Sequence, residues 1–172
     1  VVGGSITAGT GTNSITVTWG AAGPGTVDVT ETETATACSA DATQFAVTIN
    51  AVPTPVITGS ALVCVGATGS VYSVTNVVGN TYAWTVVGGS ITAGTGTNSI
   101  TVTWGAAGPG TVDVTETAAT CSTPATQFAV TINALPTPSV ITGSASVCTG
   151  VTGSVYSVTN VVGNTYAWTV VG

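Results

Sequence analysis

The chain has 172 residues, 44% of them hydrophobic, and its only formally charged side chains are 6 Asp and Glu, because it contains no Lys, Arg or His. Without cations it lacks the usual contacts to nucleic-acid phosphates and to anionic membrane surfaces. No apolar run approaches the roughly 20 residues of a membrane-spanning helix, so we expect no membrane insertion. The sequence also lacks an initiating Met, which favours an internal or processed piece of a longer chain.

The sequence is built from a long repeat. Residues 1–32 recur without change as residues 86–117, and residues 68–87 recur as residues 152–171. A period of about 84 residues is too long for one solenoid coil and suits a small β-sandwich. Pro-Thr-Pro runs at 53–55 and 136–138 stiffen the chain and interrupt sheet pairing, so they predict domain boundaries. The predicted domains are the second half of a sandwich repeat (1–52), one complete Ig-like repeat (53–136) and the first half of the next repeat (137–172).

Within the complete repeat, apolar and polar residues alternate along short segments, which is typical of strands with one buried face. The many Thr and Val residues and the absence of helical periodicity predict an all-β class, with tandem immunoglobulin-like antiparallel β-sandwich repeats. The predicted strands, in chain order, are 56–64, 71–75, 81–87, 90–92, 99–104, 111–117 and 127–132. The predicted inward residues are Tyr82, Trp84, Val86, Ile100, Val102, Trp104, Val112, Val114, Phe128, Val130 and Ile132.

The four cysteines leave more than one pairing open. A disulfide between Cys64 and Cys121 fits the predicted complete domain, would stabilise it by roughly 4 kcal/mol, and leaves Cys38 and Cys148 with partners outside this segment. The rival frame pairs Cys38 with Cys64 and Cys121 with Cys148 within the chain, and free buried thiols are the third interpretation. A zinc site is not expected, because there is no His and no CxxC. Disulfides would indicate an oxidising, extracellular or cell-surface setting.

Four separated segments carry a resemblance to a known family. They are residues 56–64, 69–74, 81–86 and 88–104, which include Thr-Tyr-Ala-Trp-Thr-Val and the long run from Gly88 to Trp104. Together they resemble the PKD-like, Ig-like repeats of very long secreted surface proteins of the Bacteroidetes. The resemblance covers the whole chain. It implies a β-sandwich with a role in adhesins, gliding filaments or other cell-surface fibres, and it brings no catalytic residues. The complete lack of Lys and Arg departs from the family.

The residue types do not favour an enzyme. A Ser or Cys nucleophile needs a neighbouring base, and the chain has neither His nor Lys. Asp28 and Glu31 have opposite parity on one predicted strand, so they point to opposite faces and do not form a glycosidase pair. We interpret the carboxylates as solvated strand residues and expect no catalytic site. They are Asp28, Glu31, Glu33 and Asp41 in the first copy, and Asp113 and Glu116 in the second.

No cofactor is expected either. Calcium is the alternative, held by acidic residues between 28 and 41 and by backbone carbonyls at an interdomain loop, although no DxDxDG loop is present. Residues 94–97, Gly-Thr-Gly-Thr, lack the GK[ST] of a phosphate loop and predict a hairpin loop instead. Trp84 and Trp104 lie on apolar alternating faces, so we expect them in the core rather than in a sugar-stacking platform.

These patterns predict a structural repeat that gives reach to an extracellular bacterial fibre or long cell-surface protein. In isolation, residues 1–52 and 137–172 would expose strand edges and apolar faces. We therefore expect neighbouring copies or adjoining repeats of the same protein as partners, with head-to-tail completion. The alternatives are an adhesin module that binds a surface glycan or protein through loops such as residues 34–41, and a non-catalytic spacer of a secreted enzyme.

Overall fold

The structure, a computed structural model, describes residues 1–171. These residues form strands and loops, and none of their segments is a helix that could cross a bilayer. The chain divides into two compact units, Val1–Ala134 and the segment from Leu135 onward. The division lies close to the predicted boundary at residue 136; the limits at 52/53 and 136/137 stay predictions.

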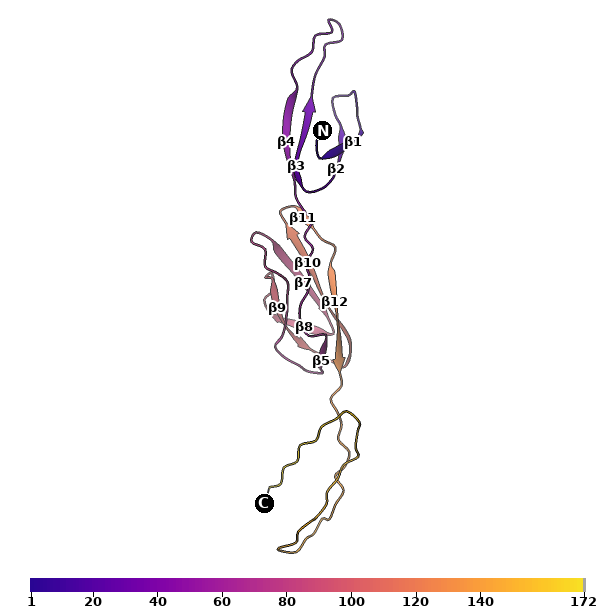
Figure 1. Cartoon of the computed structure of the whole chain (residues 1–172), viewed down its shortest axis with the longest axis vertical. Helices are drawn as coiled ribbons and strands as arrows, with labels where there is room; N and C mark the ends of the chain where they lie inside the picture. The colour runs from indigo at the N-terminus through magenta and orange to yellow at the C-terminus, as the bar shows by residue number, and fades with distance from the viewer. Residues whose placement is uncertain (172) are drawn as a thin grey trace. The chain divides into compact units, whose positions relative to one another are not determined.

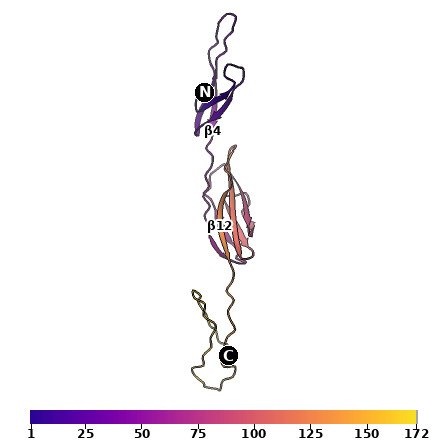
Figure 2. The same ribbon diagram turned by 90° about the vertical axis from the view of Figure 1, so that its right-hand side faces the viewer.

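The best-formed part of the first unit is a sandwich of two sheets between residues 57 and 133, called here the central sandwich (Figures 1 and 2). Its larger sheet has the strand order β7-β10-β12-β5, and β11 pairs with the last residues of β10. All pairs are antiparallel except β12 with β5, which is parallel. The strands are β5 (Leu62–Cys64), β7 (Thr81–Val87), β10 (Gly108–Ala118), β11 (Cys121–Ser122) and β12 (Thr126–Asn133).

The smaller sheet has the order β6-β9-β8, and its inner face packs on the larger sheet. Its strands are β6 (Ser70–Ser73), β8 (Gly89–Ala93) and β9 (Ser99–Trp104). The chain passes from the larger sheet to the smaller one at Gly88, which lies between β7 and β8. Gly88 has φ +81, and a Cβ there would lie 3.0 Å from the Ile132 side chain, so glycine fits both the turn and the close packing.

The all-β sandwich is as predicted, and the alternation of apolar and polar residues predicts its core residues correctly. Every predicted inward residue except Val86 and Phe128 is buried, and these two are half-buried against the core. The predicted strand 56–64 is shorter than expected. It reduces to β5 and an isolated bridge between Thr58 and Ser73, because the chain bends at Gly59, where a Cβ would overlap the Tyr72 ring. The short strand β11 was not predicted.

Residues 1–50 repeat only part of this sandwich and are called here the N-terminal half. Two antiparallel pairs, β1–β2 and β3–β4, are joined by a bridge between Val2 and Thr26. The register is conserved between copies, since Gly23 pairs with Ile49 as Gly108 pairs with Ile132. The strands are β1 (Gly4–Ala8), β2 (Thr16–Trp19), β3 (Gly23–Val29) and β4 (Thr43–Ile49), which correspond in sequence to β8, β9, β10 and β12.

Residues 135–171, called here the C-terminal segment, carry the sequence of the strands that the N-terminal half lacks. Residues 146–148, 154–157 and 165–171 correspond to β5, β6 and β7. Within the described residues of this segment there is no strand, only an isolated bridge between Thr142 and Ser157 that copies the one between Thr58 and Ser73. The segment therefore has the β5–β7 sequence without the sheets into which β5, β6 and β7 fit.

The C-terminal segment nevertheless keeps the local hydrogen bonds of its counterpart. The Tyr156 hydroxyl donates to the Ser144 carbonyl at 2.8 Å, as Tyr72 donates to Ser60 at 2.7 Å. The Val161 amide donates to the Tyr166 hydroxyl at 2.7 Å, as the Val77 amide donates to Tyr82 at 2.8 Å. The loops of the segment are thus already arranged as they are in the complete sandwich, which lowers the entropy that docking would cost.

Candidate assembly site: open sheet edges and the joint

The N-terminal half has three open strand edges. In the central sandwich, β7 covers one side of β10, β5 covers the outer side of β12, and β6 covers one side of β9. Their counterparts β3, β4 and β2 lack these neighbours within residues 1–171. Unpaired backbone N–H and C=O groups along such edges are ready to pair with an added strand.

Side chains of identical sequence context are buried in the central sandwich and exposed outside it. Val114 is 0% exposed, whereas its counterpart Val29 is 62% exposed. Trp84 is 7% exposed and its counterpart Trp168 is 51% exposed. Tyr72 and Tyr156 differ in the same way, at 0% and 45%. The predicted exposure of apolar side chains in the two flanking parts is therefore confirmed.

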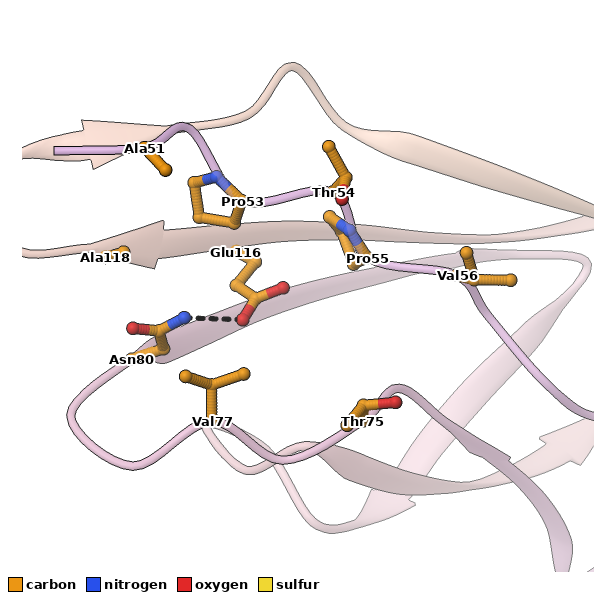
Figure 3. Close-up of a pocket in the computed structure, with 10 residues that line it drawn as sticks. All are labelled: Ala51, Pro53, Thr54, Pro55, Val56, Thr75, Val77, Asn80, Glu116 and Ala118. Atoms are coloured by element: carbon orange, nitrogen blue, oxygen red, sulfur yellow. Dashed lines mark hydrogen bonds between the residues drawn. The ribbon is translucent and has the colours of Figure 1, made fainter. Parts of the chain in front are cut away.

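The stretch around the first Pro-Thr-Pro run forms the joint between the N-terminal half and the central sandwich. Pro53 and Pro55 line a groove of about 380 Å³ together with Asn80 and Glu116 (Figure 3). The Asn80 side-chain amide donates to Glu116 Oε1 at 2.6 Å, and Figure 3 shows this pair beside the two proline rings. Residues 51–57 contain no turn or bend, as expected for a proline-stiffened connection.

Glu116 corrects one sequence-based interpretation. The sequence predicts that all the carboxylates are solvated, but Glu116 is only 4% exposed. Its burial follows from parity, because Val112, Val114 and Glu116 occupy alternate positions on the inward face of β10. A buried carboxylate requires hydrogen-bond donors, and Asn80 supplies one. Glu31, the same residue in the N-terminal half, is exposed, and residues 1–50 contain no counterpart of Asn80.

The predicted disulfide between Cys64 and Cys121 is wrong. All four cysteines are free thiols. Cys64 ends β5 and pairs with Asn133, beside the start of β10, whereas Cys121 pairs with Ala118 at the end of β10. The ten-residue separation between Gly108 and Ala118 corresponds to about 33 Å of extended chain, far beyond the Cα separation of about 7 Å that a disulfide permits.

Comparison with known proteins places this arrangement in a family. A model of the PKD-like domain matches residues 50–132 and again residues 134–172, which together make up well over half of the chain. The chain belongs to the PKD-like domain family. The first match spans the central sandwich, and the second spans the C-terminal segment, which therefore carries the beginning of a further PKD-like domain. No curated protein matches the sequence.

The tryptophans of the PKD-like domain belong to its core, as predicted. Trp84 Nε1 donates to the Thr97 carbonyl at 2.8 Å, and the Trp104 ring meets Tyr72 edge-on, with centroids 5.9 Å apart. Burial raises the pKa of the Tyr72 phenol, whose hydroxyl donates to the Ser60 carbonyl. Neither indole offers an open face for stacking a sugar ring, because both side chains are buried between the sheets.

The carboxylates of the PKD-like chain are dispersed. Asp28 accepts a hydrogen bond from the Gln44 amide at 2.9 Å, and Glu33 accepts one from Thr36 at 2.6 Å. Among residues 1–171, no three His, Cys, Asp or Glu side chains come together as a metal-binding group. Residues 94–97 lie in the β8–β9 hairpin loop, where the Thr97 hydroxyl donates to the Gly94 and Ser99 carbonyls, as the hairpin prediction requires.

Proposed function

We propose that this chain is a structural repeat unit of an extracellular fibre or long cell-surface protein, in which PKD-like domains are joined head to tail and each incomplete domain is completed by an adjoining repeat. The chain carries no catalytic role in this proposal. It supplies length, and its partners are further copies of the same repeat. PKD-like, Ig-type sandwiches are structural modules, and the proline-stiffened joints suit a mechanical role.

The observation that supports completion most strongly is the complementarity of the two flanking parts. The N-terminal half holds the counterparts of β8, β9, β10 and β12, and the C-terminal segment holds those of β5, β6 and β7. Together they account for the main strands of one sandwich, and the central sandwich gives the register of each pair. For example, Asn164 would donate to Glu31 of the adjoining repeat, as Asn80 donates to Glu116.

The geometry of the central sandwich supports an end-to-end arrangement. The chain enters beside Glu116, near the end of β10, and leaves after Asn133, whose neighbour Ile132 pairs with Gly108 at the start of β10. Eight residues of strand separate these points, which corresponds to about 26 Å. Entry and exit thus lie at opposite ends of the sandwich, so every added domain extends the chain.

Electron microscopy of the purified 172-residue chain tests the proposal. Kept reduced and raised from nanomolar to high micromolar concentration, the chain is expected to form unbranched filaments. Each copy should add two sandwiches of about 35 Å each, an axial repeat of about 70 Å. Mass spectrometry of the subunit from the native assembly then distinguishes separate copies from one continuous polypeptide. Monomers at every concentration, or a compact monomer closed on itself, would refute completion between copies.

A further inference from the structure

We propose that Cys121 of one copy forms a disulfide with Cys148 of a second copy, across the joint between two successive sandwiches. The proposal rests on the head-to-tail completion described under the proposed function. The disulfide would add a covalent link between successive sandwiches.

The position of Cys121 is the first observation. Cys121 begins β11 at the entry end of the central sandwich and is half-buried. Its thiol donates to the backbone carbonyl of Asn50 at 3.8 Å. Asn50 directly follows β4, one of the strands with an open edge. Cys121 therefore reaches the point at which the missing strand of the preceding sandwich would end.

The central sandwich shows what belongs at that point. Asn133, the counterpart of Asn50, pairs with Cys64 in the parallel β12–β5 ladder. The Asn133 carbonyl accepts the amide hydrogen of Val65 at 2.8 Å. The counterpart of Val63 and Cys64 in the C-terminal segment is the Val-Cys pair at residues 147–148.

The same register places Cys148 of a second copy beside Asn50. When residues 146–148 add to the free edge of β4, Cys148 pairs with Asn50, and the Thr149 amide donates to the Asn50 carbonyl. That oxygen has two lone pairs, so it accepts the Thr149 N–H beside the Cys121 thiol. Two cysteines thus converge on one peptide group. Neighbouring strands lie about 4.8 Å apart, so Cys148 would lie one strand spacing from Asn50, whose carbonyl oxygen is 3.8 Å from the Cys121 thiol. A disulfide requires Cα atoms about 4.4–6.8 Å apart, and it is the bond that we propose at this point.

The reaction is an ordinary thiol–disulfide exchange with oxidised glutathione as the oxidant. The Cys121 thiolate attacks glutathione disulfide, forms a mixed disulfide and releases one glutathione. Cys148 then attacks the protein sulfur of that mixed disulfide, and the second glutathione leaves. The two protein thiols lose two protons and two electrons, and one glutathione disulfide becomes two glutathione molecules. An extracellular setting is oxidising enough to maintain such a bond.

The test uses the 172-residue chain with Cys38→Ser and Cys64→Ser, which leaves only Cys121 and Cys148. The matched control carries Cys121→Ser in addition. Both chains are assembled under reducing conditions, checked for filaments and then oxidised with glutathione disulfide. We expect the first chain to lose both titratable thiols per copy and to give a ladder of multimers on a non-reducing gel, and the control to give no ladder. Chymotryptic cleavage after Trp104, Phe128 and Tyr156 should yield fragments 105–128 and 129–156 joined by a disulfide.

Each remaining outcome overturns the proposal, and the outcomes are distinguishable. Filaments whose two thiols stay titratable refute the disulfide and leave head-to-tail completion intact. A disulfide found only in monomers shows that the two cysteines meet within one copy, which also refutes the link between copies. If no filaments form in the reduced chain, completion itself fails, and the disulfide fails with it.

Discussion

Replacing Trp104 by alanine is expected to lower the free energy of unfolding of the central sandwich by about 3–5 kcal/mol. Trp104 is 1% exposed and fills the space between the sheets. The Trp104 ring packs directly against Gly89 and Gly110. A Cβ atom would lie 2.9 Å from the ring at Gly89 and 2.7 Å from it at Gly110. Small side chains on either side cannot expand to fill the cavity, so the loss should fall at the upper end for core substitutions.

Urea denaturation followed by near-ultraviolet circular dichroism measures this loss in the dilute, reduced chain. Domains of this size have stabilities of about 5–15 kcal/mol, so the variant should unfold at much lower urea or not fold at all. Trp104→Phe keeps an aromatic ring, and its loss should be smaller but still measurable. Trp19→Ala is the matched control, because Trp19 is the same residue in the N-terminal half and lies outside the central sandwich. A Trp104→Ala loss below about 1 kcal/mol, or an equal loss for Trp19→Ala, would contradict the described core.

Replacing Trp168 by alanine is expected to leave the central sandwich unchanged and to abolish assembly at ordinary concentrations. Trp168 is half-exposed in the single chain, while its counterpart Trp84 is buried and donates to Thr97. If Trp168 becomes buried only when a second copy binds, the substitution weakens the free energy of association by about 3–5 kcal/mol. That corresponds to a rise of about 100-fold or more in the concentration needed for assembly. Light scattering of a concentration series measures the shift.

Val162→Ala provides the control for Trp168. Val162 is exposed in the single chain, and its counterpart Val78 stays exposed in the complete sandwich. Docking therefore does not bury Val162, and its truncation should not change the concentration at which the chain assembles. Equal effects of the two substitutions would mean that the C-terminal segment does not dock in the register of β5, β6 and β7.

The sandwich and its core could be predicted from the sequence because the information lies in local alternation. Val112 and Val114 on one strand, and Ile100 and Val102 on another, face inward as their parity predicts. Glu116 follows the same parity, yet its charge suggested a solvated position. The periodicity of the strand, rather than the residue type, decides the side on which Glu116 lies. The partner that allows its burial, Asn80, lies 36 residues away and carries no local signal.

The cysteine pairing could not be predicted from the sequence for a topological reason. Cys64 and Cys121 lie in one repeat, which favours a pair, but their positions depend on which strands are neighbours. The parallel addition of β5 to β12 places Cys64 at the exit end, and the hairpin of β10 with β11 places Cys121 at the entry end. Neither strand pairing can be recognised from the alternation of apolar and polar residues along the chain. The Pro-Thr-Pro run predicts the joint, but the meeting of residues 51–56 with Asn80 and Glu116 emerges only in three dimensions.

Hydrogen exchange tests the central claim most directly, because residues 81–87 and 165–171 have the same sequence and give one peptide mass. In the dilute reduced chain, this peptide should show two isotope envelopes of equal intensity, one slow from β7 and one fast from the C-terminal segment. In the assembled chain, both copies should exchange slowly and the two envelopes should merge into one. Two envelopes that persist in the assembled chain would contradict completion by a second copy, and so would a single slow envelope at every concentration.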